Sequence, residues 1–354
     1  MCVVACTDDT RRTALDQPPY PPFRPHPLIR GGHLQTVLGR YLPGPRLVEG
    51  GARYRVELEA GDALVVVEDV PTTWEVGDPC AVLVHGLGGD ARSDYLWRVS
   101  AKLVKLGIRA IRVNLRNAGD GFGLSRKFYN AGLTGDLRRV FDWLAPRAPG
   151  SPVGLIGFSL GGNLALKLAS EAAAEPVPGL DCVLAANPPL DLEACCVQLQ
   201  KRSNRLYDAN FVRILTDCVA RLHATRPDLG PIDLSGVRSL KGFDEIYTAP
   251  RHGYRDARAY YEDASAGPRL HRIAVPGLVV HARDDPFMPA GSVDAARFPA
   301  DLALEMFSSG GHLGYLARGH RWLDGRLARW LADRWGRDGA GPGRAHRGRS
   351  ATTI

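Results

Sequence analysis

The chain has 354 residues, 45% of them hydrophobic, which is enough for the core of one large α/β domain with an insertion or of two domains. It contains no run of about 20 apolar residues, and this excludes a membrane-spanning helix. Its formal net charge of +7 comes without a nucleic-acid recognition motif, so we do not expect a protein that binds DNA or RNA.

The two ends of the chain and its cysteines indicate where the protein works. We expect residues 1–20 to form a flexible tail, and its apolar start is too short and lacks the basic lead of a signal peptide. Residues 336–354 are rich in Gly and contain four arginines, which predicts a disordered basic tail. The seven cysteines lack metal-site spacing, and the neighbours Cys195 and Cys196 could not easily pair with each other. Reduced thiols in a cytoplasmic protein are the simpler interpretation.

Much of the chain is predicted to consist of strands separated by crossover connections. A Pro-rich stretch over 18–27 predicts an extended arm, and Tyr54–Ala60 with Ala63–Val70 predicts an antiparallel hairpin. Short, continuous apolar runs follow, most of them far enough apart for a crossover helix: Cys80–Val84, Ala110–Val113, Val153–Ile156, Cys182–Ala185, Gly277–Val280 and Leu302–Phe307. Apolar strands alternating with helices are typical of a mostly parallel sheet covered on both faces, an α/β fold.

One interval of about 80 residues interrupts this alternation after the sixth strand. Its clearest pattern is an apolar stripe at helical spacing, in Phe211, Ile214, Leu215, Cys218, Val219 and Leu222. We interpret residues 188–270 as a helical cap inserted into a core made of 21–187 and 271–335. A last helix over Gly319–Trp335 is expected to close that core.

The strongest chemical signal is the stretch from Leu155 to Asn163. Apolar residues lead into a Gly-x-Ser-x-Gly box, Gly157 to Gly161, and then into a helix start rich in small residues. This pattern predicts a nucleophile elbow, in which Ser159 sits on a strained strand-to-helix turn and attacks carbonyl groups. The flanking glycines are needed because side chains there would clash with the neighbouring strand and helix.

A serine hydroxyl needs a base to take its proton and an acid to orient that base. Asp285 is the preferred acid, because it follows a buried strand and lies four residues before Pro289 in a proline-closed turn. Asp284 remains the alternative acid. His312 is the predicted base, since it follows the last strand in a Gly-rich loop and completes the chain order Ser, Asp, His. Other histidines, at 271, 281 and 320, are interpreted as surface or turn residues.

The oxyanion of the reaction requires two preset donors. We expect them to be the backbone N–H groups of Leu160, which follows the nucleophile, and of Leu87 in the Gly-rich loop after Cys80–Val84. His85 is interpreted as a structural histidine of that loop. The segment Asn117–Gly123 lacks the ending of a phosphate loop and is expected to line the mouth of the site. No acidic cluster has the histidine spacing of a metal site, so neither metal nor cofactor is expected.

With these residues, the chain resembles the YheT-like branch of the α/β-hydrolases, also called the AB hydrolase-4 family. The resemblance covers roughly residues 20–335 and includes Gly32–Thr36, Phe243-Asp244-Glu245, Thr248-Ala249-Pro250, Gly253-Tyr254, Tyr260-Tyr261 and Asp285–Met288. The chain departs from the family pattern over Arg116–Gly121 and Tyr129–Gly132, which could alter the wall of the pocket. The resemblance implies an α/β-hydrolase fold and carboxylic ester hydrolysis, with eukaryotic relatives that act on acylglycerols and phospholipids or transfer fatty acyl groups to alcohols.

The sequence therefore predicts a cofactor-free serine esterase whose small-molecule substrate is an ester with an apolar acyl group. The alternative is an acyltransferase that uses the same triad to pass the acyl group to an alcohol. A third interpretation is a binding module that keeps the fold without the chemistry.

Overall fold

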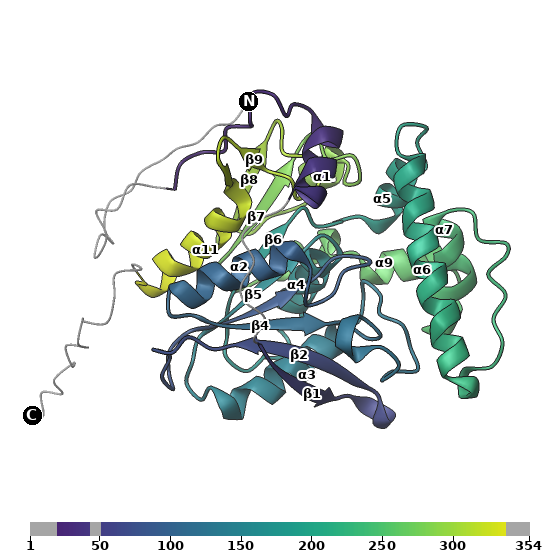
Figure 1. Cartoon of the computed structure of the whole chain (residues 1–354), viewed down its shortest axis with the longest axis horizontal. Coiled ribbons are helices and arrows are strands. Elements are labelled where there is room, and N and C mark those ends of the chain that lie inside the picture. The colour runs from purple at the N-terminus through teal and green to yellow at the C-terminus, as the bar shows by residue number, and fades with distance from the viewer. Residues whose placement is uncertain (1–19, 43–50, 338–354) are drawn as a thin grey trace, which may run out of the picture.

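The computed structural model of the protein describes residues 20–42 and 51–337 (Figure 1). The predicted tails, 1–20 and 336–354, lie outside the described residues except for Tyr20, Gly336 and Arg337. In the described part of the chain, the free cysteines are Cys80, Cys182, Cys195, Cys196 and Cys218.

Eight strands form one sheet in the order β1-β2-β4-β3-β5-β6-β7-β8. The strands are β1 (Ala52–Glu57), β2 (Ala63–Asp69), β3 (Cys80–Val84), β4 (Arg109–Asn114), β5 (Val153–Phe158), β6 (Leu180–Ala186), β7 (Gly277–Ala282) and β8 (Leu302–Phe307). The hairpin β1–β2 is antiparallel and joins β4 antiparallel, whereas every pairing from β4 through β8 is parallel. The predicted mostly parallel sheet is therefore confirmed.

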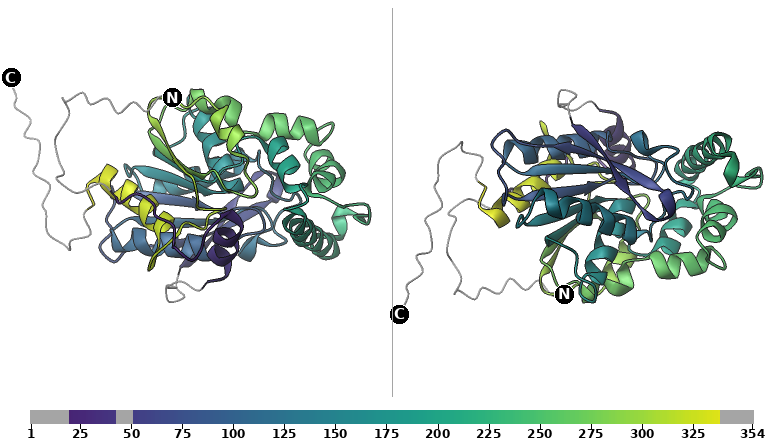
Figure 2. Two further views of the ribbon diagram at one scale, coloured as in Figure 1. Left: turned by 90° about the horizontal axis from the view of Figure 1, so that it is seen from above. Right: turned by 90° about the horizontal axis from the view of Figure 1, so that it is seen from below.

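Two layers of helices cover the sheet (Figure 2). On β3, Val82 and Val84 pack in the same apolar cluster as α3 (Thr134–Leu144) and α4 (Leu160–Glu171). The alternate residues Ala81 and Leu83 pack with α2 (Asp94–Lys105) and α11 (Trp322–Trp335). Because successive side chains of a strand point to opposite faces, a continuous apolar run places both faces in a core.

Short elements complete the part of the fold outside the interval between β6 and β7. They are α1 (Gly32–Tyr41), η1 (Glu59–Gly61), η2 (Gly119–Gly121), η3 (Ala145–Arg147), α10 (Ala290–Asp294), β9 (Leu316–Ala317) and β10 (His320–Arg321).

The last helix begins later than the sequence predicts. Residues 319–321 do not belong to it, because Gly319 turns the chain at φ +79° and His320–Arg321 pairs with Leu316–Ala317 as a two-stranded ribbon. Helix α11 then starts at Trp322, whose N–H donates to the carbonyl of Tyr315.

Between β6 and β7 lies a helical insertion, which projects beyond the edge of the sheet (Figures 1 and 2). It comprises α5 (Leu192–Leu199), α6 (Arg205–Thr225), η4 (Pro227–Leu229), α7 (Leu240–Phe243), the π-helical turn η5 (Asp244–Thr248), α8 (Ala249–Arg251), α9 (Ala257–Ala264) and η6 (Gly267–Arg272). Residues 188–270 are all described and contain no strand. Leu215, Val219 and Leu222 of the predicted stripe are buried. Within the described residues, no helix combines the length and apolar character needed to cross a membrane.

Candidate active site

The candidate site lies where the parallel strands end. Ser159 follows β5, Asn187 follows β6, Asp285 follows β7 and His312 follows β8. Because these strands are parallel neighbours, their carboxyl ends meet at one edge of the sheet. Side chains far apart in the sequence are thereby brought together.

Ser159 occupies a strained turn between β5 and α4. Its backbone has φ 52° and ψ −123°, in a region that L-residues rarely adopt. A Cβ atom at Gly157 would overlap the carbonyl of Gly161, and one at Gly161 would overlap the carbonyls of Val84 and His85. Both glycines are thus required by close backbone packing, which lets the turn present the serine at the sheet edge.

Three side chains form a continuous hydrogen-bonded chain. The Oγ of Ser159 lies 2.9 Å from Nε2 of His312, and Nδ1 of His312 lies 2.8 Å from Oδ2 of Asp285. An ionised carboxylate can only accept, so Nδ1 carries the proton and Nε2 is free to accept the serine proton. The arrangement can convert the serine hydroxyl into a nucleophile.

Asp285 is held by four donors. Its Oδ1 accepts the N–H groups of Phe287 at 2.8 Å and Met288 at 3.2 Å. Its Oδ2 accepts His312 and, at 2.6 Å, the Nδ2 amide of Asn187. Burial by itself would raise the pKa of Asp285, but the neighbouring imidazole and the N–H donors outweigh it and hold the pKa below its ordinary value. The carboxylate therefore stays ionised although only 4% of the residue is exposed.

Asn187 is a site residue that sequence reasoning missed. Its φ of 45° is unusual for a residue other than glycine, and Nδ2 also donates to the carbonyl of Gly311 at 3.2 Å. One side chain thus ties the acid to the loop that carries the base. Its position in the sequence could have revealed it. Asn187 lies two residues after the predicted strand Cys182–Ala185, at the carboxyl end of a strand, where site residues of parallel sheets gather.

The loop that carries His312 is fixed by α1 and by the second aspartate. Thr36 accepts the N–H of His312 at 2.8 Å, while its own hydroxyl donates to the carbonyl of Gly32. Gln35 reaches the backbone of Leu316 through both ends of its amide. The Oδ1 of Asp284 accepts the N–H of Gly311 at 2.8 Å, so the structure places Asp284 on the loop backbone and Asp285 on the imidazole.

The loop after β3 is clamped on both sides of Leu87. The N–H of Gly86 donates to the hydroxyl of Tyr95 at 2.9 Å, and that of Gly88 to the hydroxyl of Tyr129 at 2.7 Å. Within the described chain no group accepts the N–H of Leu87 or of Leu160. These two donors therefore remain available beside Ser159.

His85 is a structural histidine of this loop, as the sequence predicts. Its Nδ1 lies 2.7 Å from the carbonyl of Gly86, and its Nε2 lies 3.2 Å from the N–H of Leu115. Burial lowers the pKa of His85 to about 4, which keeps the ring neutral. A neutral imidazole can donate to one backbone group while it accepts from the other.

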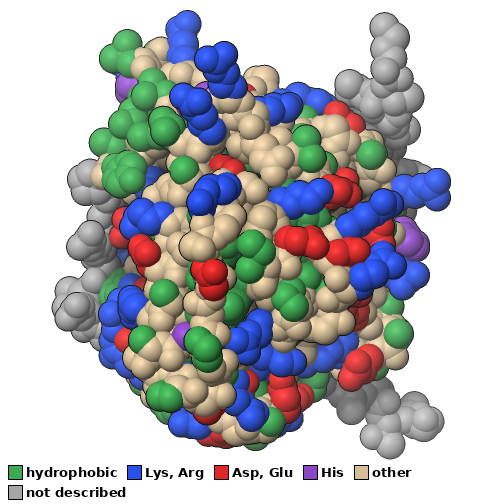
Figure 3. All heavy atoms as spheres, turned by 90° about the vertical axis from the view of Figure 1, so that its right-hand side faces the viewer, with side chains coloured by type: hydrophobic (Ala, Val, Ile, Leu, Met, Phe, Trp, Pro, Cys, Tyr) green, Lys and Arg blue, Asp and Glu red, His purple; other side chains and the backbone are tan. Residues whose placement is uncertain are grey.

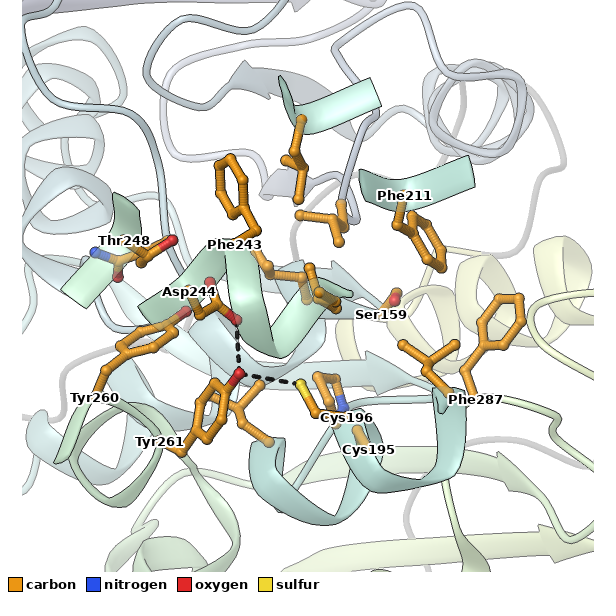
Figure 4. Close-up of a pocket in the computed structure, with 18 of the residues that line it drawn as sticks. Ser159, Cys195, Cys196, Phe211, Phe243, Asp244, Thr248, Tyr260, Tyr261 and Phe287 are labelled. Atoms are coloured by element: carbon orange, nitrogen blue, oxygen red, sulfur yellow. Dashed lines mark hydrogen bonds between the residues drawn. The ribbon is translucent and has the colours of Figure 1, made fainter. Parts of the chain in front are cut away.

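An apolar cavity leads from Ser159 into the helical insertion (Figure 4). Its lining side chains come mainly from the insertion and from the loops after β3, β4 and β7, among them Leu87, Tyr129, Leu160, Leu192, Leu199, Phe211, Leu215, Phe243, Phe287 and Met288. At its far end lies Asp244, whose Oδ2 accepts the hydroxyl of Tyr261 at 2.8 Å. Burial raises the pKa of Asp244 to about 6.

Two predictions about residues around the site are wrong. His281 is neither a surface nor a turn residue: it lies in β7 and is fully buried. A central parallel strand is covered on both faces, which leaves no solvent-facing position for it. His271 and His320 are exposed, as predicted.

The segment Asn117–Gly123 does not line the cavity either, as far as the described residues show. Asn117 donates to the carbonyls of Ser125 and Lys127, and Phe122 lies under the guanidinium of Arg221. Gly121 of this loop packs against Val65 of β2. Of the two departures from the family pattern, only the one at Tyr129 and Asn130 reaches the cavity wall.

In the described residues no group of three or more His, Cys, Asp and Glu side chains is arranged to hold a metal ion. The site combines a hydroxyl, an imidazole and a carboxylate in one hydrogen-bonded chain with two free N–H groups, a set of groups that can carry out acyl transfer.

The chain is similar in sequence and in fold to known proteins. A family model described as the alpha/beta hydrolase fold matches residues 82–318. YheT of Escherichia coli K12 is 32% identical over 84% of this chain and 89% of its own length. The "Monoacylglycerol lipase" of Saccharomyces cerevisiae is 28% identical over 72% of this chain, which spans 59% of that protein. The solved esterase Pf2001 of Pyrococcus furiosus superposes with a TM-score of 0.54 at 16% identity, over 83% of this chain and 99% of its own.

Proposed function

The chain belongs to the α/β-hydrolase fold family, in the YheT branch, and we propose that it is a carboxylic ester hydrolase that acts through Ser159, His312 and Asp285. The observation that carries this proposal is the unbroken hydrogen-bonded chain from the hydroxyl of Ser159 through the imidazole to the carboxylate. Relatives that carry the name of a lipase support it.

Acylation begins when Nε2 of His312 takes the proton of Ser159 and Oγ attacks the ester carbonyl. The carbonyl oxygen becomes an oxyanion, and the N–H groups of Leu87 and Leu160 would stabilise it. The imidazolium then returns its proton to the departing alcohol, which leaves an acyl group on Oγ. Asp285 keeps Nδ1 protonated and stabilises the imidazolium throughout.

Deacylation repeats these steps with water as the nucleophile. His312 takes one proton from the water, hydroxide adds to the acyl carbon, and the same two N–H groups hold the second oxyanion. Collapse of this intermediate releases the carboxylic acid and returns the proton to Ser159.

The cavity indicates the acyl part of the substrate. Its walls between Ser159 and Asp244 are almost entirely apolar side chains, so an apolar acyl chain would bury its surface there. We propose that residues 188–270 act as the cap over this chain, since α5, α6, α7 and α9 supply much of the lining.

Replacing the nucleophile tests the function directly. The Ser159→Ala variant should lose at least about 10³-fold of kcat on p-nitrophenyl butyrate and all labelling by a fluorophosphonate probe. The matched control is Ser203→Ala, an exposed serine in the turn before α6, which should keep both. Undiminished turnover in a folded Ser159→Ala protein would refute the proposal. Product analysis with ethanol present separates hydrolysis from transfer to an alcohol.

A further inference from the structure

Apolar side chains stand exposed beside the entrance to the site. On the segment before α1, Leu28 is 82% exposed, and at the end of α1 Tyr41 is 77% exposed. At the start of α6, Leu206 is 79% exposed. Burying such side chains in an apolar environment is favourable, so a cluster of them marks a surface that meets a partner.

Helix α1 is anchored on only one of its sides. Its buried side, with Gln35 and Thr36, holds the loop of His312. Leu34, Val37 and Tyr41 recur at spacings of three and four residues and share its exposed side. The exposed side is therefore left without a partner among the described residues.

Helices α1 and α6 form one continuous surface. The ring of His33 stacks on that of Tyr207 at 5.7 Å, and its Nδ1 lies 3.2 Å from the Tyr207 hydroxyl. We call this surface the mouth face and define it as residues 24–42 with 201–207.

The mouth face is positively charged. It contains six exposed cationic residues, Arg24, Arg30, Arg40, Lys201, Arg202 and Arg205. Neither of its two segments contains an Asp or Glu. Three acids of the described chain lie close to it: Asp94, at 3.9 Å from Arg40, Asp284, which packs against Gly32 and accepts the N–H of Gly311, and Asp208, which is buried and accepts the N–H of Leu240. Such a surface complements a negatively charged partner.

The path to the nucleophile opens on this face. A groove that reaches Ser159 and His312 is bordered on one side by Val37 and Tyr41 and on the other by Tyr207. Figure 3 shows hydrophobic side chains gathered at the upper left, beside Lys and Arg side chains at the top, at the height of α1 in Figure 1.

We propose that the mouth face seats on the surface of an anionic phospholipid bilayer, so that ester substrates enter the groove from the lipid. The identity of the ester substrate that enters the groove rests on the proposed function, whereas binding of the mouth face to lipid does not. Apolar side chains that protrude singly from separate elements suit a fluid lipid surface, whereas a folded protein partner would need a matching concave face. Exposed cations around them add attraction to anionic headgroups.

The test is co-sedimentation of the full chain with sucrose-loaded vesicles of phosphatidylcholine, alone or mixed with phosphatidylglycerol. We expect binding to the mixed vesicles. The double variant Leu28→Ser/Leu206→Ser should weaken it about tenfold, because neither serine can insert into lipid. The matched control is Val70→Ser/Val76→Ser, whose valines are 47% and 67% exposed near the opposite edge of the sheet. Binding by this control should stay within about twofold of the unmodified chain.

Charge is tested separately. Lys201→Gln/Arg202→Gln/Arg205→Gln should weaken binding to the vesicles that contain phosphatidylglycerol, since the attraction depends on anionic lipid. Its interaction with vesicles of phosphatidylcholine alone should not change. Its control, Arg344→Gln/Arg347→Gln/Arg349→Gln, removes cations from the C-terminal segment and should bind like the unmodified chain.

The proposal is overturned if the full chain binds neither kind of vesicle. It is also overturned if Leu28→Ser/Leu206→Ser and Val70→Ser/Val76→Ser bind equally well, or if the C-terminal variant alone loses binding. Absence of vesicle binding would instead favour an acidic protein as the partner. Soluble p-nitrophenyl butyrate should be hydrolysed normally by Leu28→Ser/Leu206→Ser. Undiminished activity of Ser159→Ala would refute the proposed function but would not affect the vesicle-binding result.

Discussion

Two buried aspartates in different regions of the molecule have pKa values that are shifted in opposite directions. Asp285, at the sheet edge, receives four N–H donors, one of them the imidazole of His312, and its pKa falls below the ordinary value. Asp244, in the helical insertion, receives hydroxyl groups of Tyr261 and Thr248, and burial raises its pKa to about 6. The two residues are 4% and 8% exposed, so burial alone does not decide the outcome. The number of N–H donors and a basic neighbour decide in which direction the pKa of a buried carboxyl is shifted.

Removing the charge of Asp285 should have the largest effect. Asp285→Asn should lower kcat about 10⁴-fold with the fold retained, because an amide no longer selects the imidazole tautomer that accepts from Ser159. Steady-state kinetics and thermal unfolding measure both consequences. Asp284→Asn is the matched control and should lose less than about tenfold, since an amide oxygen can still accept the N–H of Gly311. The reverse ranking would assign the acid to Asp284.

Taking one donor from Asp285 should have a smaller effect. Asn187→Gly removes the amide and suits the backbone, whose φ is 45°. We expect kcat to fall about tenfold. A carboxylate with fewer donors is a stronger base and a better partner for imidazolium, so the acidic limb of the kcat/KM profile should move to higher pH. An unchanged limb would show that Asn187 only supports the loop of Gly311.

Neutralising Asp244 should change the pH dependence of stability. A pKa raised to about 6 from 3.8 means that the folded state binds the proton more tightly than the unfolded state does. The contribution of Asp244 to stability is therefore full below pH 3.8 and falls as pH rises through about 6. Asp244→Asn lacks this loss, so its stability relative to the unmodified chain should rise by about 2 kcal/mol between pH 4 and pH 7. Urea unfolding at both pH values measures this, and a pH-independent difference would contradict it.

Removing the hydroxyl that donates to Asp244 should have the smallest effect. Tyr261→Phe should lower the free energy of unfolding by about 1 kcal/mol at neutral pH, where the carboxylate needs its donor most. Tyr254→Phe, whose hydroxyl donates to the more exposed Asp263, is the control and should lose less. Equal losses would mean that the two hydroxyl groups stabilise the fold to the same extent.

The sequence supports a site prediction where the expected chemistry demands a fixed order of residues. Ser159, Asp285 and His312 could be chosen because each follows a recognisable apolar strand and the three occur in the order of a nucleophile, an acid and a base. The sheet itself followed from continuous apolar runs, and it is confirmed.

The partners of these residues could not be predicted in the same way. Thr36 and Tyr129 accept backbone N–H groups that lie 276 and 41 residues away in the sequence, and such bonds leave no periodic pattern. His281 was misassigned because a polar residue inside a strand resembles the start of a turn. Its burial depends on the helices that cover β7, which local sequence does not specify.

The bond between Thr36 and His312 has a consequence for the timing of synthesis. Ser159 and the segment of Thr36 are both made before His312. His312 is made after Asp285 and is held by a residue made 276 positions earlier. The hydrogen-bonded chain from Ser159 to Asp285 therefore cannot form in a nascent chain until the segment that carries His312 has been made and has met α1.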